Sequence, residues 1–188
     1  GGFVEKVSFP VPEEMPFDEW VDVRSPLEFG EDHLSGAINL PVLSDDERAD
    51  IGTLYRQVSA FEARRKGAAI VSRNIADHID RHFADKPKNY RPLVYCWRGG
   101  QRSESMATIL SGIGWHVCQL EGGYCEYRRH VVRTIREKSN RLKLVVLNGL
   151  TGAGKTRILE TLQRQGEQIL DLEGYASHRG SVFGGDLQ

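Results

Sequence analysis

The sequence predicts an α/β fold in which a mainly parallel sheet is flanked by helices, and three observations predict it. Short apolar runs alternate with amphipathic helical stretches along most of the chain. One apolar run ends at a cysteine whose loop leads into a helix. Another ends at a glycine-rich loop that also opens a helix. Strand–loop–helix units repeated in this way are typical of parallel sheets.

Composition limits the functions that the chain can have. Its 188 residues, 39% hydrophobic and 27% charged, are enough for one ample core or two small ones. The net charge of −1 provides no general attraction for nucleic acid, so any such contact needs a local basic patch. Three cysteines without metal-ligand spacing argue against a disulfide scaffold, predict no metal site and fit a reducing cytoplasm. No apolar run reaches membrane-spanning length, so we expect a cytoplasmic protein without a membrane contact.

The first predicted elements are two short strands followed by a helical segment. One strand ends at Asp22 and leads through a proline turn and a loop to a second strand, which ends at Pro41. Residues from about 44 to 85 read as a helical insert, with apolar side chains at helical spacing. We expect Gly67 to divide this insert into two helices.

The next strand, Leu93–Tyr95, ends at the most informative motif of the chain, residues 96–103 (the Cys96 loop). Inward-pointing N–H groups, the N-terminus of the following helix and the charges of Arg98 and Arg102 all favour a thiolate at Cys96, which is the nucleophilic form. A buried structural cysteine would not need two arginines and two glycines beside it. We therefore predict catalytic roles for Cys96, Arg98 and Arg102, within an anion cradle formed by Gly99, Gly100, Gln101 and Ser103.

A basic helix is expected after the strand that runs from Trp115 to Leu120. Residues 124–143 are rich in arginine and lysine, and Arg129, Arg133 and Arg136 fall on one face of the predicted helix. This face either contacts RNA phosphates or is a solvated surface that leads into a linker, and the sequence leaves both readings open.

A second phosphate site is predicted near the end of the chain. Residues 142–147 read as a fully buried strand, and the loop that follows matches the P-loop spacing before a helix. The glycines let backbone N–H groups approach phosphates, Lys155 neutralises their oxygens, and Thr156 can hold magnesium. The predicted phosphate-binding residues are Gly149, Thr151, Gly152, Gly154, Lys155 and Thr156. After a further strand at 168–172 few residues follow, so we expect only the first part of a P-loop domain, in a truncated chain.

Several motifs together resemble the rhodanese superfamily, in which the loop cysteine carries a transferable sulfur or selenium atom. They are Asp22-Val23-Arg24, Glu28-Phe29, His33-Leu34, Gly36-Ala37, Asn39-Leu40-Pro41, the Cys96 loop and Gly122-Gly123. Two departures narrow the resemblance. Five residues separate Cys96 from Arg102, one more than in common sulfurtransferases of this superfamily, and far more residues than usual separate Pro41 from Cys96.

A rhodanese domain followed directly by a P-loop resembles one family of bacterial enzymes, the tRNA 2-selenouridine synthases. Further motifs match that family: Glu121-Gly122-Gly123-Tyr124, Asp171-Leu172-Glu173-Gly174 and His178-Arg179-Gly180-Ser181. The resemblance implies a rhodanese-like domain over residues 1–136, with the insert at 44–85, and the first part of a P-loop domain over 137–188.

The same resemblance implies a reaction and its substrates. Sulfur in the wobble 2-thiouridine of tRNA would be replaced by selenium from selenophosphate, through an S-geranyl intermediate made with geranyl diphosphate. Cys96 would carry the selenium and the P-loop would bind a diphosphate, with magnesium at Thr156 left open. Partners would be tRNA and a supplier of selenophosphate. Candidate contacts to tRNA or diphosphate are Glu173, His178, Arg179, Arg129 and Arg133.

Three other functions remain open at this point. A rhodanese-type sulfurtransferase or persulfide carrier would cleave thiosulfate without tRNA. A cysteine phosphatase fits the Cys96-to-Arg102 spacing, but only Glu104 and Glu121 lie near the loop in sequence as general acids. A non-catalytic RNA-binding fragment would bind tRNA in a salt-dependent manner without turnover. We also expect Asp22 and Arg24 to form a structural ion pair beneath the loop, and Cys118 to lie in the core.

Overall fold

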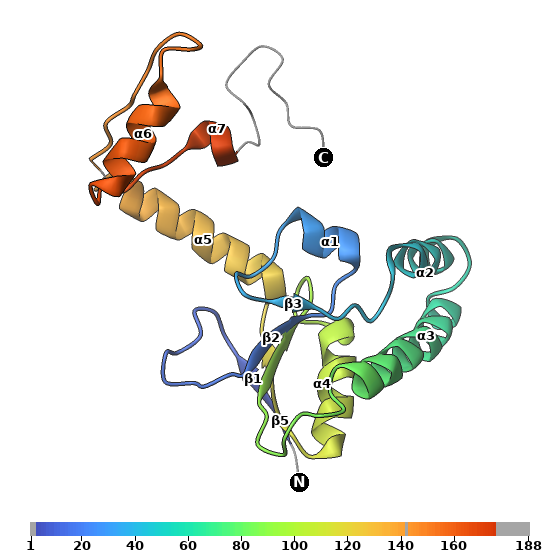
Figure 1. The fold of residues 1–188 in the computed structure, drawn as a ribbon. Helices are drawn as coiled ribbons and strands as arrows, with labels where there is room; N and C mark the ends of the chain where they lie inside the picture. The colour runs from blue at the N-terminus through green and yellow to red at the C-terminus, as the bar shows by residue number, and fades with distance from the viewer. Residues whose placement is uncertain (1–2, 142, 176–188) are drawn as a thin grey trace. The chain divides into compact units, whose positions relative to one another are not determined.

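The structure is a computed structural model that describes residues 3–141 and 143–175. The chain divides into two compact units, Gly1–Asn140 and Arg141–Gln188. The first unit is a parallel sheet with helices on both faces, as predicted (Figure 1). Among the described helices, none is both long enough and apolar enough to cross a membrane.

The sheet has the strand order β1-β5-β4-β2-β3, and every pair in it is parallel. The strands are β1 (Phe3–Val7), β2 (Glu19–Asp22), β3 (Ile38–Asn39), β4 (Pro92–Tyr95) and β5 (His116–Leu120). All four residues of β4 are buried, which explains its continuous apolar sequence between two neighbouring strands. Asp22 pairs in register with Asn39 on one side and Tyr95 on the other, so the carboxyl ends of these strands meet at one edge of the sheet.

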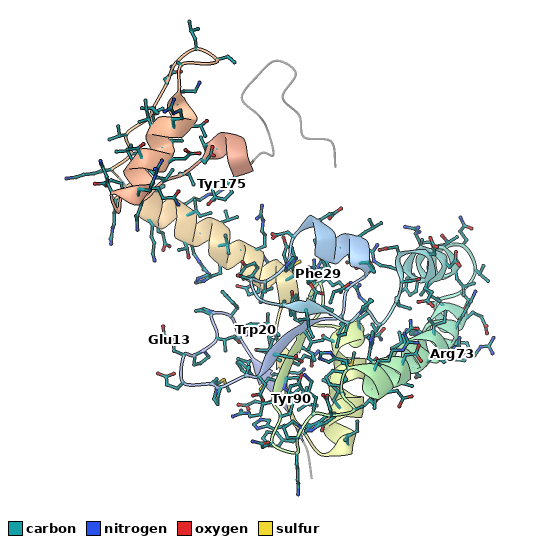
Figure 2. All side chains as sticks on the ribbon, in the orientation of Figure 1. Glu13, Trp20, Phe29, Arg73, Tyr90 and Tyr175 are labelled. Atoms are coloured by element: carbon teal, nitrogen blue, oxygen red, sulfur yellow. The ribbon has the colours of Figure 1, made fainter. Side chains whose placement is uncertain are left out.

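Each face of the sheet carries its own apolar cluster. Helices α3 (Ala60–Arg81) and α4 (Gln101–Ile113) cover one face, where Val94 and Val117 pack against Met106 and Leu110. The opposite face is covered by segment 9–17 and the start of α5 (Gly123–Ser139). Figure 2 shows Glu13 in that segment on the far side of the sheet from Arg73 of α3. Both layers together hold β4, and hence the Cys96 loop, in a fixed position.

The helical insert divides at a different residue from the one predicted. Helix α2 (Asp45–Gln57) ends before Val58, and α3 begins after Ser59, whose hydroxyl accepts N–H groups of the first turn. Gly67 lies inside α3, so the prediction that it separates two helices is wrong. Ser59 is the N-cap that determines the boundary, whereas a glycine inside a helix costs only about 1 kcal/mol and is tolerated.

Two elements of the first unit were not predicted. Strand β1 is a short edge strand beside β5. Helix α1 (Pro26–Glu31) replaces part of the loop expected after Asp22. Its sequence carries a capping box, with Ser25 at the N-cap and Glu28 three residues later, and this pattern could have indicated the helix.

The second unit contains the helices α6 (Lys155–Arg164) and α7 (Leu172–Tyr175). The predicted strands at 142–147 and 168–172 are wrong for the part of this unit that the structure describes, because residues 143–150 and 167–171 adopt no regular structure. Val145 is 96% exposed. A strand needs a neighbour for its N–H and C=O groups, and the described residues of this unit include no strand. Residue 142 lies outside the described residues.

Candidate active site

Cys96 lies between the end of β4 and the N-terminus of α4, and its residue is only 3% exposed. Its Sγ accepts a hydrogen bond from the Gly100 N–H at 3.2 Å and lies 3.2 Å from the Ser103 hydroxyl oxygen. The N–H groups in the first turn of a helix have no acceptor within the helix, so this end of α4 attracts negative charge. The site therefore places a sulfur atom beside a backbone N–H donor at a helix N-terminus, a position that suits an anionic ligand.

The Cys96 loop is held from behind by the N-terminus of α5. The N–H of Tyr124 donates to the carbonyl of Cys96 at 2.9 Å, and the N–H of Cys125 donates to the carbonyl of Trp97 at 3.0 Å. This close approach depends on Gly123, which has φ +53°, because a Cβ there would lie 2.2 Å from the Cys96 carbonyl oxygen. Hydrogen bonding of both carbonyls to α5 fixes the direction in which the loop faces.

A buried glutamine, Gln119 of β5, holds the Cys96 loop through two hydrogen bonds. The side-chain amide of Gln119 donates to the carbonyl of Gly99 at 3.1 Å and to the hydroxyl of Ser103 at 2.9 Å. The Ser103 hydroxyl in turn donates to the carbonyl of Gly100 at 3.1 Å. Gln119 was not predicted as a site residue. The sequence did offer one indication of its role, because Gln119 is a polar residue in an otherwise apolar, buried strand, and a buried amide needs hydrogen-bond partners.

The two arginines of the loop lie in different environments. Arg102 forms a bidentate ion pair with Glu28, at 2.7 and 3.2 Å, and Glu28 also contacts Arg48 of α2 at 3.2 Å. Burial alone would raise the pKa of Glu28, but the hydrogen bonds and charge of Arg102 hold it at about 2. The side chain of Arg98 is exposed, and no ion-pair partner is found for it among the described residues. Only Arg98 therefore presents an unpaired guanidinium at the loop in this structure.

The predicted ion pair beneath the loop is confirmed. Arg24 and Asp22 are both fully buried, and their closest oxygen–nitrogen distance is 2.7 Å. Burial by itself would lower the pKa of Arg24, but the hydrogen bonds and charge of Asp22 raise it. The Arg24 guanidinium lies 4.2 Å from the ring centroid of Tyr124 and 5.9 Å from that of Trp97. The Asp22–Arg24 ion pair therefore holds the guanidinium in place against the rings of Tyr124 and Trp97.

Trp97 exposes an aromatic surface next to Cys96. It is 39% exposed, and its ring centroid lies 5.3 Å from that of Tyr124. The Tyr124 hydroxyl donates to Asp32 at 2.6 Å, and burial together with that carboxylate raises the pKa of Tyr124 to about 12. The tyrosine thus remains a neutral support for Trp97, whose outer face can stack on a ring.

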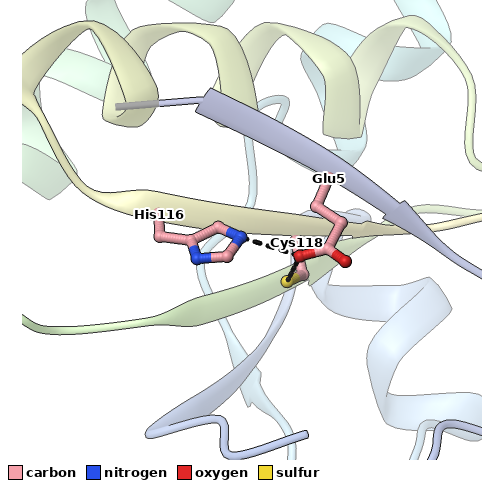
Figure 3. A group of neighbouring side chains, drawn as sticks. All are labelled: Glu5, His116 and Cys118. Carbon is pink, nitrogen blue, oxygen red and sulfur yellow. Dashed lines mark hydrogen bonds and ion pairs between the residues drawn. The ribbon is translucent and has the colours of Figure 1, made fainter. Parts of the chain in front are cut away.

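Cys118 lies in the core as predicted, within a small polar cluster on β1 and β5 (Figure 3). Glu5, His116 and Cys118 offer ligand atoms within 4.8 Å of one another, and these residue types can bind zinc. The His116 Nε2 is 2.8 Å from the Glu5 carboxylate. Burial, with the Glu5 charge, raises the pKa of the Cys118 thiol, which disfavours the thiolate that zinc requires. We read the cluster as a hydrogen-bonded part of the β1–β5 pair.

The second unit brings several predicted P-loop residues together. The Lys155 ammonium donates to the carbonyls of Gly149 at 2.9 Å and Leu150 at 3.2 Å, across the loop. Gly152 and Gly154 have φ +83° and +80°, which side chains rarely adopt, and Gly154 is the N-cap of α6. Thr151 and Thr156 are exposed residues of the same loop and helix. The loop therefore has the glycine conformations and the lysine that phosphate binding needs.

The remaining predicted contact residues lie elsewhere. Arg129 and Arg133 are exposed on α5, where Arg129 pairs with Glu126 at 2.9 Å. Glu173 belongs to α7. His178 and Arg179 lie outside the described residues.

Comparisons with known families match both parts of the chain. Residues 12–130 match the rhodanese-like domain family. Residues 142–188 match the tRNA 2-selenouridine synthase AAA domain.

Comparisons with individual proteins agree with these matches. The tRNA 2-selenouridine synthase of Nitrosomonas europaea is 39% identical over 88% of this chain and 43% of its own length. The tRNA 2-selenouridine synthase of Sulfurovum sp. is 36% identical over 89% of this chain and 45% of its own length. A crystal structure of the N-terminal domain of a protein described as ATP/GTP-binding, from Clostridium difficile 630, is 41% identical with a TM-score of 0.54. It covers 60% of this chain and 88% of that domain. The chain thus spans about half the length of the curated relatives it matches.

The close approach at Gly123 leads to a first prediction. Gly123→Ala should lower the free energy of unfolding by more than about 2 kcal/mol, because the methyl group meets the Cys96 carbonyl and the residue must keep a positive φ. Urea unfolding measures this effect, and the alkylation rate of Cys96 reports displacement of the loop. Gly112→Ala is the control, because nothing lies within 4 Å of its added methyl in α4, and it should be neutral or slightly stabilising. Unchanged stability of Gly123→Ala would contradict the described packing.

The ion pair of Glu28 leads to a second prediction. Glu28→Gln should cost about 1–3 kcal/mol at pH 7, because Arg102 loses a charged acceptor. Since the pKa of Glu28 is lowered from 4.5 to about 2, its stabilisation is complete above about pH 4.5 and is lost as the pH falls toward 2. Urea unfolding at pH 7 and pH 3 should therefore show a smaller difference between variant and wild type at pH 3. The exposed pair of Glu62 and Arg65 provides the control, Glu62→Gln, with a change below about 0.5 kcal/mol. An equal difference at both pH values would contradict the assignment.

Proposed function

Because the chain belongs to the rhodanese-like domain family and its residues 142–188 match a tRNA 2-selenouridine synthase domain, we propose that it is part of a tRNA-modifying selenium transferase. The observation that carries the proposal is the position of the Cys96 sulfur at the N-terminus of α4, within 3.2 Å of both the Gly100 N–H and the Ser103 hydroxyl. A sulfur so placed can react with a substrate whose phosphate group binds beside it.

In the proposed first step, the Cys96 thiolate attacks the selenium of selenophosphate. A sulfur–selenium bond forms as the selenium–phosphorus bond breaks, and the electron pair of the broken bond leaves with phosphorus as phosphite. The N–H groups of the Cys96 loop and the exposed Arg98 stabilise the oxygen charges of the leaving group. Arg102 can assist once an anion competes with Glu28 for its guanidinium.

In the second proposed step, the terminal selenium on Cys96 attacks C2 of the wobble S-geranyl-2-thiouridine of tRNA, and a carbon–selenium bond forms as the carbon–sulfur bond breaks and geranylthiolate leaves. Two equivalents of a small thiol then reduce the sulfur–selenium bond, which releases 2-selenouridine and free Cys96, and the thiols leave as a disulfide. The exposed face of Trp97 lies next to Cys96 and offers a surface on which a uracil ring can stack. Arg129 and Arg133 on α5 are exposed cations suited to tRNA phosphates. A tRNA substrate and three free thiols are consistent with a cytoplasmic enzyme.

We further propose that the P-loop binds the diphosphate of geranyl diphosphate. The loop glycines and Lys155 supply the donors and the charge that a diphosphate needs. Thr156, directly after Lys155, is assigned the magnesium contact that would accompany the diphosphate.

The second candidate function is a rhodanese-type sulfurtransferase or persulfide carrier, which the same cysteine loop supports. It differs in its donor, since thiosulfate would supply sulfur and tRNA would not be needed.

The selenium-carrier role gives a third prediction. After incubation with selenophosphate, wild-type protein should carry close to one selenium per chain, on the peptide that contains Cys96, and Cys96→Ser should carry none. Elemental analysis measures selenium, and peptide mass spectrometry locates it. Cys125→Ser is the matched control, because Cys125 is partly exposed and adjoins the loop through its backbone, and it should retain the adduct.

Three results would contradict this role. Selenium retained in Cys96→Ser would show that another residue is the nucleophile. A phosphate adduct on Cys96 would mean attack at phosphorus with release of hydroselenide. No selenium, but a persulfide formed from thiosulfate, would favour the sulfurtransferase.

The P-loop assignment gives a fourth prediction. Lys155→Ala should weaken binding of geranyl diphosphate by about tenfold or more, because the charge facing the diphosphate is lost. Calorimetric titration measures the affinity, and Lys143→Ala, an exposed lysine ahead of the loop, should leave it unchanged. ATP should not compete. Displacement of geranyl diphosphate by ATP at equal concentration would identify the site as one for nucleotides instead.

A further inference from the structure

The hydroxyl of Ser103 lies among three polar partners, and one of them is the sulfur of Cys96. Its oxygen is 3.2 Å from the Cys96 Sγ, 3.1 Å from the carbonyl oxygen of Gly100 and 2.9 Å from the amide nitrogen of Gln119. Ser103, Cys96 and Gln119 are all buried. Buried polar atoms need hydrogen-bond partners within the protein, so these four groups have to satisfy one another.

Gln119 determines how much of the Ser103 hydroxyl is left for the other partners. The Gly99 carbonyl, 3.1 Å from the amide nitrogen, can only accept a hydrogen bond, so the amide turns its NH2 group toward it. The second N–H of that group donates to the Ser103 oxygen. One lone pair of the hydroxyl is thereby occupied, and one proton and one lone pair remain for Cys96 and Gly100.

The remaining proton of Ser103 serves a different partner in each protonation state of Cys96. While Cys96 is a thiol, the hydroxyl donates to the Gly100 carbonyl, and the thiol can donate to the free lone pair of the hydroxyl. A thiolate can only accept, so the hydroxyl then has to turn its proton from Gly100 to the sulfur. The Gly100 carbonyl still has a donor in that state, because it also accepts the N–H of Glu104 at 3.1 Å.

We propose that the Ser103 hydroxyl is a hydrogen-bond switch that stabilises the Cys96 thiolate, and that Gln119 is the positioning residue that holds its oxygen at the sulfur. This inference rests on the proposed function, in which that thiolate attacks selenium. The thiolate has two donors, the Gly100 N–H and the Ser103 hydroxyl, and hydrogen bonds to an ion are stronger than those between neutral groups. When the sulfur–selenium bond forms, the charge leaves the Cys96 sulfur and the hydroxyl turns back to Gly100.

The charged groups around the loop allow this switch to be measured between pH 7 and pH 10. Arginines stay protonated and carboxylates stay ionised over that range. The pKa of Glu28 is about 2 and that of Tyr124 is about 12, so neither group changes its charge there. The charged or titratable groups packed around the loop are Arg98 and Arg102 in the loop, Glu28 on α1, the Asp22–Arg24 pair beneath it, and Tyr124 and Cys125 on α5.

The fifth prediction concerns alkylation of Cys96 by iodoacetamide in the whole chain, measured at pH 7 and pH 10 on the Cys96 peptide by mass spectrometry. Ser103→Ala should react about tenfold more slowly than wild type at pH 7, because the thiolate loses a donor. At pH 10 its rate should be within about twofold of wild type, because a thiol ionises there without such help. The ratio of the two rates cancels any change in the access of the reagent to Cys96.

Gln119→Met tests the positioning role, because it keeps the length of the side chain and removes the amide that holds the Ser103 oxygen. It should slow alkylation about threefold at pH 7 and leave the rate at pH 10 near that of wild type. It also keeps the test valid if Ser103→Ala folds poorly. Ser103→Thr restores a hydroxyl and should return the ratio of the two rates to that of wild type.

Ser105→Ala is the matched control. Its hydroxyl lies two residues further along α4 and donates to the Gln101 carbonyl at 2.8 Å, so its removal should leave both rates unchanged. Cys125→Ser should also keep the wild-type ratio, which shows that the second thiol beside the loop does not produce the effect.

Three results would overturn these roles. Equal slowing of Ser103→Ala at both pH values would indicate lost access instead of a less stable thiolate. A wild-type rate for Ser103→Ala at pH 7 would show that the Gly100 N–H and the end of α4 stabilise the thiolate alone. A wild-type ratio in Gln119→Met would reject Gln119 as the positioning residue. Alkylation uses no selenium, so a wild type that shows the expected ratios but takes up no selenium would reject the selenium carrier and support the switch.

Discussion

The contact between Gly123 and the backbone of the Cys96 loop is the constraint on which the rest of the site depends. A side chain at Gly123 would occupy the place of the Cys96 carbonyl, so only glycine lets the N-terminus of α5 reach the loop. Once it does, two N–H groups of α5 bond the carbonyls of Cys96 and Trp97. The carbonyls then face α5, and the sulfur lies at the N-terminus of α4, where it accepts the N–H of Gly100. The close backbone contact at Gly123 thereby places the Cys96 sulfur where an anion can bind.

Buried polar groups make this geometry rigid rather than merely possible. Gln119 joins Gly99 to Ser103 from within β5, and the Asp22–Arg24 pair supports Tyr124 and Trp97 from beneath. Each of these groups is buried and hydrogen-bonded, so a shift of the loop would leave at least one donor or acceptor without a partner. Such losses cost about 1–3 kcal/mol each, which favours a single loop conformation.

The sequence was most predictive where a local pattern has one physical solution. The strand before Cys96 and the helix after it were predicted because an apolar run, a glycine-rich turn and an amphipathic stretch follow one another. The contact of Glu28 with Arg102 and the site role of Gln119 were not predicted, because both arise from contacts across the fold, to Arg102 and to Ser103. The boundary between the two helices of the insert was assigned to Gly67 because glycine disfavours helix, whereas the structure places it at Ser59, whose hydroxyl caps α3. The strand at 142–147 was predicted from its apolar residues alone, but strand formation also requires a neighbouring strand.

Glu28 connects three parts of the first unit that are distant in sequence. It caps α1 through the Ser25 N–H, pairs with Arg102 of the Cys96 loop and contacts Arg48 of the insert. With its pKa at about 2, it remains a carboxylate across the physiological range and keeps both arginines in place. Because one carboxylate serves all three partners, loss of Glu28 would leave the first turn of α1, the Cys96 loop and the insert without their shared contact at the same time.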